Sequence, residues 1–371
     1  MLRELKISNY RVFESLTMED LGRVNLIVGK NGSGKTSVLE AAALLATEGS
    51  PSMLYRILEQ RGEVVVHERR EFCDWYDISH LFRGRQLHPG KEVRIEGTGD
   101  ESVQVRFEIQ PYTIRKDEGG ERASTYVAQG RLPEGTQCLR IATTPGNREW
   151  LYPLSADGEI SGKHPEWGRV GDGVGERSLH VNLLPPAGLS DKDIRALWNE
   201  IELTPEEEHV LESLRILEPK IEGLRYLSGR SGSPAGSGHG NGFYCKLKGV
   251  DARIPLGSLG EGMKRLFGLA AAIVQSRNSL ALIDEIDTGL HYSSMPDLWR
   301  MVIETARRLD VQVFATTHSQ DCVNGLATLH RESSELTSDV RVHRVQTDMS
   351  KTVAYSPDQI EIADRHHVEV R

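Results

Sequence analysis

A Gly-rich run at residues 29–36, Gly-Lys-Asn-Gly-Ser-Gly-Lys-Thr, limits the fold of this 371-residue chain more than any other feature. It fits G-x-x-x-x-G-K-[ST], follows an apolar run at 24–28 and precedes a helical pattern at 37–47. Between a strand and a helix, such a loop wraps its backbone N–H groups around a triphosphate. Lys35 would reach the β- and γ-phosphates and Thr36 would bind Mg²⁺. The alternative is a Gly-rich turn that binds nothing, and the flanking strand and helix favour the phosphate site.

Composition and charge narrow the class of protein. Charged residues make up 27% and hydrophobic residues 38% of the chain, which is an ordinary balance for a soluble protein. The sequence contains no run of 18 apolar residues, so no membrane span is expected. The alternating first residues indicate a strand and not a signal peptide. The net charge of −9 argues against a generally basic nucleic-acid binder but leaves room for a local basic patch. The four cysteines form no C-x-x-C pair, so neither a disulfide framework nor a zinc site is expected and a cytoplasmic location fits; they are Cys73, Cys138, Cys245 and Cys322.

The pattern along the chain predicts three segments. Residues 1–188 begin with strand, phosphate loop and helix, continue with alternating strands near 92–96 and 103–109, and include a loop-rich insertion at 142–175. Residues 189–242 read as a helical lobe up to 227, with a capping box at Thr204 to Glu207, followed by a Gly/Ser-rich loop at 228–242. Residues 243–371 carry the remaining polar motifs, then two short strands and a final helix.

Two carboxylates follow a continuous apolar run at residues 279–283. Such a run is typical of a parallel strand buried on both faces, and α/β folds bind ligands at the carboxyl ends of these strands. Asp284 would hold Mg²⁺ through its water shell, and Glu285 would orient and deprotonate the attacking water. The alternative interpretation is a strand end with two solvated acids and no ligand. The phosphate loop elsewhere in the chain favours the metal and catalytic roles over this alternative.

A histidine and a glycine-rich helix start complete the candidate chemistry. His318 follows a second apolar strand at 311–317 and could donate a hydrogen bond to the γ-phosphate; a structural histidine is the alternative. Ser258, Gly260 and Gly262 precede an apolar helix, and this combination can form a second anion site. That site could complete the nucleotide pocket of another subunit, and an ordinary helix cap is an equally good interpretation.

These motifs occur in the order found in ABC-type ATPase heads: the phosphate loop, Ser-Leu-Gly-Glu-Gly, Leu-Ile-Asp-Glu, Asp287 two residues later, and Thr-Thr-His-Ser. The whole chain resembles the SMC/RecF/OLD branch of these ATPases. Its opening at residues 5–13 is similar to that branch's first strand, and residues 287–291 resemble its D-loop. The resemblance is closest to short stand-alone AAA family ATPases, many of which occur in prokaryotic phage-defence operons.

The resemblance implies an α/β P-loop NTPase fold, an ABC-type ATPase head with a mixed or parallel central sheet, an antiparallel β subdomain and a helical lobe. In that fold residues 1–188 and 243–371 are the two halves of the head. The cofactors implied are ATP and Mg²⁺. The loop residues that would bind them are Asn31, Gly32, Ser33, Gly34, Lys35, Thr36 and Ser37.

The resemblance also implies roles outside the loop. Asp284 would support Mg²⁺, Glu285 would be the general base and His318 would sense the γ-phosphate. The residues implied to meet a nucleotide elsewhere are Ser258, Gly260 and Gly262 from the opposite subunit, Asp287 at that interface, and Arg11 near the α-phosphate or base. The family's Q-loop glutamine has no secure counterpart here: Gln86 is a weak candidate, and Asn182 is in the expected place but is the wrong residue type.

ATP-driven dimerisation is the mechanism this implies, with two heads enclosing two nucleotides until hydrolysis separates them. We expect a homodimer, or an assembly of dimers, that switches a separate effector such as a nuclease or toxin in antiphage defence. About 50 residues follow His318, too few for an additional nuclease domain, so none is expected in this chain. The alternatives are a RecF-like DNA-binding repair ATPase and an ATP-gated scaffold that does not hydrolyse.

Overall fold

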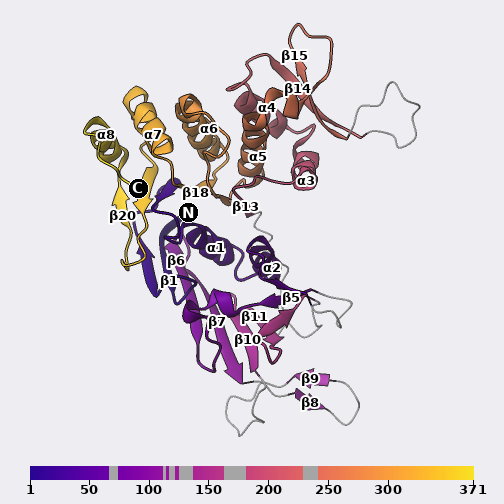
Figure 1. The fold of residues 1–371 in the computed structure, drawn as a ribbon, viewed down its shortest axis with the longest axis vertical. Helices are drawn as coiled ribbons and strands as arrows, with labels where there is room; N and C mark the ends of the chain where they lie inside the picture. Colours follow the sequence, from indigo (N-terminus) through magenta and orange to yellow (C-terminus); the bar gives the residue numbers. More distant parts are fainter. Residues whose placement is uncertain (67–73, 112–113, 117–121, 125–136, 163–180, 229–240) are drawn as a thin grey trace. The chain divides into compact units, whose positions relative to one another are not determined.

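The computed structural model describes residues 1–66, 74–111, 114–116, 122–124, 137–162, 181–228 and 241–371. The chain forms two compact units, each assembled from separate stretches of sequence (Figure 1). The first unit comprises residues 1–21, 31–179 and 345–353, and the second comprises 22–30, 180–344 and 354–371. The sequential division at 188 and 242 stays a prediction. In the described ranges, every helix is too short or too polar to span a bilayer.

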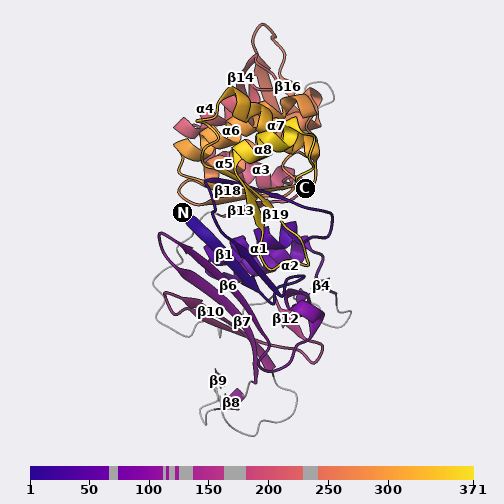
Figure 2. The ribbon, with the colours of Figure 1, turned by 90° about the vertical axis from the view of Figure 1, so that its left-hand side faces the viewer.

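A six-stranded antiparallel sheet forms the centre of the first unit, and Figure 2 shows its strands side by side. Alternating residues such as Val93, Ile95 and Phe107 turn one face of this sheet inward. Helix α1 (Lys35–Ala46) packs on that face so closely that a Cβ on Gly97 would lie 2.4 Å from a methyl carbon of Leu45. The strand order is β11 (Glu149–Pro153), β10 (Gln137–Thr144), β7 (Val103–Pro111), β6 (Glu92–Gly99), β1 (Leu2–Ser8) and β2 (Ser15–Met18).

Smaller elements complete the first unit. They are α2 (Pro51–Gln60), a sheet of β12 (Glu159–Ser161), β5 (Trp75–Asp77) and β4 (Val64–Val65), a ribbon of β8 (Ile114–Lys116) and β9 (Arg122–Ser124), and the 3₁₀ turns Ser79–Leu81 and Arg83–Arg85. The predicted loop-rich insertion at 142–175 is wrong for its first part. Strand β11 pairs with β10, so apolar residues such as Ile141 and Trp150 face each other across the hairpin. Residues 163–175 lie outside the described part.

A sheet with a parallel core forms the centre of the second unit. Its order is β13 (Asn182–Leu184), β17 (Leu280–Ile283), β18 (Gln312–Thr317), β3 (Val24–Val28), β19 (Val340–Arg344) and β20 (Val353–Tyr355), and the pairs from β13 to β19 are parallel. All five residues of β3 are buried, as the continuous apolar run predicts. Helices of this unit stand in a row in Figure 1: α5 (Glu261–Gln275), α6 (Met295–Arg308), α7 (Gln320–Glu332) and α8 (Pro357–Arg365).

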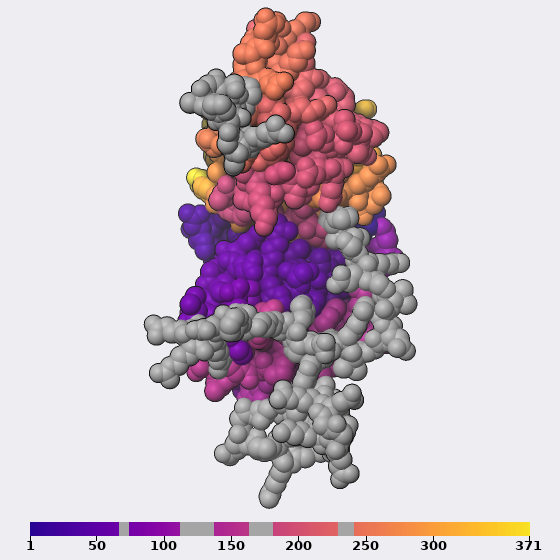
Figure 3. All heavy atoms as spheres, turned by 90° about the vertical axis from the view of Figure 1, so that its right-hand side faces the viewer, coloured from indigo at the N-terminus to yellow at the C-terminus, as the bar shows by residue number. Residues whose placement is uncertain are grey.

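The lobe after β13 contains two short helices, α3 (Asp191–Ile201) and α4 (Pro205–Leu214), and the strands β14 (Ile221–Leu227), β15 (Gly242–Leu247) and β16 (Ile254–Pro255). This part of the chain, pink to orange, makes up much of the second unit's surface in Figure 3. Two predictions fail here. Residues 221–227 form a strand, because β15 pairs with them. The capping box is absent from the described contacts of α4: the Thr204 hydroxyl donates to the Ile201 carbonyl at 2.5 Å instead.

The predicted fold class is otherwise confirmed. The phosphate-loop helix, the apolar strands before Asp284 and His318, the two late strands and the final helix are all present. The parallel register places Val28 beside Thr317 and Ile283 beside Ala315, so β3, β17 and β18 end at one edge of the sheet. The Gly/Ser-rich stretch falls almost entirely on residues 229–240, outside the described part.

Candidate nucleotide site

The phosphate loop joins β3 of the second unit to α1 of the first. Its last glycine, Gly34, is the N-cap of α1 and has a φ of 95°, which a residue with a side chain rarely adopts. A Cβ on Gly34 would lie 2.4 Å from Phe13 Cζ and 2.8 Å from Val12 Cγ2. Glycine is therefore required both by the backbone conformation and by the close approach of residues 12 and 13. Gly32 has a φ of 77° and open space around it.

The start of α1 fits an anion. In the described residues of this helix, the first turn contains no acidic side chain. The N-cap residue is Gly34, which has no side chain to accept a hydrogen bond from the first N–H groups. The positive end of the helix dipole is thus not offset locally. The hydroxyl of Ser33 is buried and has no hydrogen-bond partner among the described residues. It could therefore donate a hydrogen bond to a phosphate oxygen. The Lys35 side chain is also largely buried.

The two carboxylates follow β17 in the second unit. Asp284 is 5% exposed and accepts a hydrogen bond from Thr316 Oγ1 at 2.5 Å. Its own N–H donates to the Leu184 carbonyl at 2.8 Å. The Glu285 N–H donates to the same Thr316 hydroxyl at 2.9 Å. One threonine on β18 thus fixes both acidic residues, and sequence reasoning gave it no role.

Glu285 and His318 lie within reach of each other. His318 Nδ1 is 3.3 Å from Glu285 Oε1, and both side chains are partly exposed. Thr288 Oγ1 is 3.4 Å from the other carboxylate oxygen of Glu285. The backbone of Glu285 has a φ of 48°, a left-handed conformation that costs energy for a residue with a side chain. A strained, half-exposed acid beside a histidine is an arrangement suited to proton transfer.

Asp287 and the glycines at the start of α5 belong to the same unit. Thr317 Oγ1 donates to Asp287 Oδ1 at 2.6 Å, which fixes the carboxylate against the end of β18. Ser258 lies in a 3₁₀ turn (Leu256–Leu259) and is exposed, and Gly260 is the N-cap of α5 with a φ of 100°. A Cβ on Gly262 would lie 3.0 Å from the Gly289 carbonyl. The start of α5 therefore packs on the segment that contains Asp287.

A buried arginine missing from the sequence prediction ties this region together. Arg265 donates to the backbone carbonyls of Pro185, Asp284 and Glu285, each at 2.9 Å. Burial lowers the pKa of Arg265, and the acids at 284, 287 and 285 oppose that effect. Arg265 thus links α5 to the turn that contains both carboxylates. An arginine in an otherwise apolar stretch of helix was the signal available in the sequence.

Arg11 is engaged by carboxylates in the first unit. Its Nε lies 2.5 Å from Glu40 Oε2 and its Nη1 lies 2.7 Å from Glu63 Oε1. Its predicted nucleotide contact stays a prediction. The sequence analysis gave neither Glu40 nor Glu63 a role, although Glu40 is the one acid in the otherwise largely apolar sequence of α1 and is itself a signal.

Both Q-loop candidates stay predictions, and the structure places them in different units. The Asn182 side-chain amide donates to the Ala272 carbonyl at 3.3 Å and to Gln275 at 3.1 Å, so it faces the end of α5. Gln86 ends a 3₁₀ turn in the first unit. The carbonyl of Leu184, the last residue of β13, accepts from the Asp284 N–H, and the carbonyl of Pro185 accepts from Arg265 on α5.

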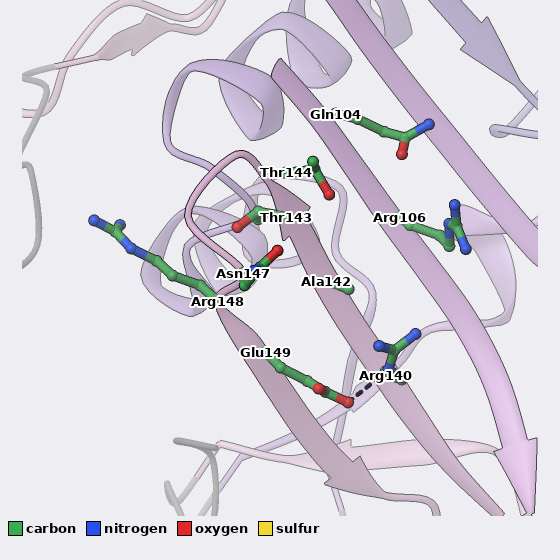
Figure 4. Close-up of a pocket in the computed structure, with 9 residues that line it drawn as sticks. All are labelled: Gln104, Arg106, Arg140, Ala142, Thr143, Thr144, Asn147, Arg148 and Glu149. Carbon is green, nitrogen blue, oxygen red and sulfur yellow. Dashed lines mark hydrogen bonds and ion pairs between the residues drawn. The ribbon is translucent and has the colours of Figure 1, made fainter. Parts of the chain in front are cut away.

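A hollow of about 340 Å³ lies on the sheet of the first unit (Figure 4). Ala142 lies beside the side chains of Arg106 and Arg140 in its lining. Arg140 is paired with Glu149 at 2.5 Å and with Glu108 at 3.5 Å. This hollow contains no residue of the predicted site.

Comparisons with known proteins identify the ATPase modules. A family described as "AAA ATPase domain" matches residues 1–110, and one described as "AAA domain, putative AbiEii toxin, Type IV TA system" matches residues 180–322. Between them they cover the phosphate loop and both carboxylates. Residues 1–110 and 180–322 are therefore similar to AAA-type ATPase domains. The family resemblance drawn from the motifs is thereby confirmed.

Several known proteins are similar to this chain. An "ATP/GTP phosphatase" of Helicobacter pylori is 22% identical over 349 residues, which is 90% of this chain and 89% of that protein. The DNA replication and repair protein RecF of Pseudoalteromonas translucida is 30% identical over 120 residues, and the match spans 31% of that protein. Among solved structures, an SMC head bound to the C-winged helix domain of ScpA covers 96% of this chain at 13% identity, with a TM-score of 0.48.

Proposed function

We propose that this ATPase binds ATP and Mg²⁺ at its phosphate loop and uses ATP-dependent dimerisation to switch a separate effector. Lys35 and the loop N–H groups hold the triphosphate. Thr36 and Asp284 would hold a Mg²⁺ ion, which would supply positive charge beside the phosphate oxygens. The uncapped start of α1 and the buried, unpartnered Ser33 hydroxyl support this assignment.

In the proposed reaction, Glu285 accepts a proton from the attacking water and orients that water toward the γ-phosphorus. His318 donates a hydrogen bond to a γ-phosphate oxygen and, being 3.3 Å from Glu285, holds the carboxylate in place. The contact between Glu285 and His318 is the single observation that carries this proposal. A site that only bound ATP would not require a base beside its γ-phosphate sensor.

The proposed dimer places the exposed Ser258 and Gly260 of one subunit on the γ-phosphate held by the other, with Asp287 at the interface. Their position at the start of α5 gives an anion the N–H groups of a helix end. Loss of the γ-phosphate would remove the group shared by both subunits. Nucleotide then shifts the equilibrium because it binds the dimer more tightly than the monomer.

An effector in antiphage defence is the best-supported target of this switch. The description of the family matched by residues 180–322 names a putative toxin of a toxin–antitoxin system, which supports a toxic partner or target. We propose a nuclease or toxin as the partner, and the cytoplasm as the location.

Light scattering tests the dimer. Purified wild type and Glu285→Gln should both be monomers of 41.4 kDa without nucleotide. With ATP and Mg²⁺, the Glu285→Gln variant should double in mass and stay dimeric, because it binds but does not cleave. Ser258→Arg combined with Glu285→Gln is the control and should stay monomeric. A Glu285→Gln protein that binds ATP and remains monomeric would overturn the dimerisation proposal.

A RecF-like role in DNA repair is the second candidate, favoured by the 30% identity to RecF. That match spans less than a third of the RecF protein, and the net charge of −9 disfavours a DNA-binding surface. A non-hydrolysing scaffold is the third candidate. With ATP, wild type would then stay dimeric just as Glu285→Gln does. A wild type that hydrolyses ATP would return to the monomer, so light scattering on both proteins separates the scaffold from the other two candidates.

A further inference from the structure

A buried carboxylate on the phosphate-loop helix connects three segments of the first unit. Glu40 lies on α1, about one and a half turns after Lys35, and is 2% exposed. Its Oε1 is 2.5 Å from Arg61 Nε, and its Oε2 is 2.5 Å from Arg11 Nε. The Tyr10 hydroxyl donates to Oε2 at 3.1 Å. One side chain of α1 therefore holds the loop after β1 and the residue that follows α2.

The loop after β1 lies directly against the phosphate loop. Phe13 and Val12 are the side chains that a Cβ on Gly34 would strike. Arg11 has a φ of 51°, so the backbone at this point is held in a conformation unfavourable for arginine. Contacts elsewhere must stabilise that conformation. The ion pair to Glu40 and the pair to Glu63 are the charged contacts of Arg11 in the described residues.

The same residues border a cavity of about 420 Å³ that reaches the first turns of α1 at Ser37. Arg11 and Val12 line it from the loop after β1, and Arg61 lines it from the end of α2. Burial raises the pKa of Tyr10, so its hydroxyl remains a donor to Glu40 at neutral pH. The Tyr10 hydroxyl is therefore one of the donors that hold the Glu40 carboxylate.

We propose that Glu40 is a positioning residue for ATP binding: by holding Tyr10 and Arg11 to α1, it fixes the loop of residues 10–13 against Gly34 and so fixes the shape of the phosphate loop. This inference rests on the phosphate loop being the nucleotide site. Glu40 touches no nucleotide itself. It acts through Arg11, Phe13 and the glycine that begins the helix.

The proposal predicts which kinetic constant changes. The phosphate loop holds the triphosphate in the bound state and in the transition state alike, and loss of such uniform binding raises KM and leaves kcat nearly unchanged. Glu40→Gln keeps the size of the side chain and removes its charge. We expect KM for ATP to rise about 10-fold with kcat within about 3-fold of wild type. Tyr10→Phe, which removes one hydrogen bond, should raise KM about 2- to 3-fold.

Glu149→Gln is the matched control. It also removes one negative charge of the first unit that is paired with an arginine at 2.5 Å, but Glu149 lies on β11 and pairs with Arg140, so the link between α1 and residues 10–13 stays. KM for Glu149→Gln should remain within about 2-fold of wild type. Equal changes in KM for Glu40→Gln and Glu149→Gln would show a general charge effect and overturn the proposal, as would an unchanged or lowered KM in Glu40→Gln.

Two further results separate this inference from its premise. Lys35→Ala should abolish ATP binding if the phosphate loop is the nucleotide site. If ATP still binds to this variant, the proposed nucleotide site is wrong, and not only the positioning role of Glu40. Thermal unfolding shows whether Glu40→Gln folds. If that variant does not fold, Tyr10→Phe still decides, because a wild-type KM in this milder variant would contradict the positioning role.

Discussion

Glu285 combines an unfavourable backbone with a partly exposed carboxylate. A non-glycine residue at a φ of 48° costs about 1–3 kcal/mol, and the surrounding structure must supply that energy. Here Thr316 accepts from its N–H and Arg265 donates to its carbonyl. The backbone of the proposed base is thus fixed on both sides, while its side chain remains free to meet His318 and water.

Gly34 and Gly32 allow a prediction at the residue scale. Gly34→Ala should lower the free energy of unfolding by about 2–4 kcal/mol, because a Cβ is both strained at a φ of 95° and driven into Phe13. Gly32→Ala, with a φ of 77° and open space, should cost only about 1 kcal/mol. Urea unfolding curves measure both. Equal losses would contradict the close packing of Phe13 on the phosphate loop.

The strand ends were predictable from the sequence and the links between elements were not. Apolar runs before Asp284 and His318 indicate buried strands, and parallel strands bring their carboxyl ends to one edge. The roles of Glu40 and Arg265 depend on contacts with residues far away in the sequence, which no local pattern encodes. Strand β14 was missed for the same reason, because its partner β15 follows the Gly/Ser-rich stretch.

Helix α5 provides a prediction at the element scale. Arg265→Met removes three hydrogen bonds that join α5 to the turn of Asp284 and Glu285, so the proposed base should lose its orientation. We expect kcat to fall about 10- to 100-fold. Arg265→Lys should recover little of this loss, since an ammonium group cannot reproduce the planar fork.

Steady-state ATP hydrolysis measures the effect, with Arg277→Met as the control. Arg277 is an exposed arginine just after α5, and it pairs with Glu206 and not with the turn of Asp284 and Glu285. Its replacement should leave kcat unchanged. Wild-type kcat in a folded Arg265→Met protein would show that α5 does not position Glu285.

For the molecule as a whole, net charge predicts the response to DNA. A chain with a net charge of −9 lacks the overall attraction to phosphates that non-specific DNA binding requires. ATP turnover should therefore be unchanged when duplex DNA is added at about 50 mM salt. Turnover that rises with DNA and loses this increase at higher salt would favour the RecF-like alternative instead.

We propose above all that the phosphate loop binds ATP and that Glu285 is the general base for its hydrolysis. A chemical-quench experiment, in which excess protein is mixed with radiolabelled ATP and Mg²⁺ and the reaction is stopped with acid, tests both roles most directly. Wild type should convert bound ATP to phosphate in one turnover, whereas Glu285→Gln should bind ATP equally well and release phosphate at least about 100-fold more slowly. Phosphate released by Glu285→Gln at the wild-type rate would contradict the account.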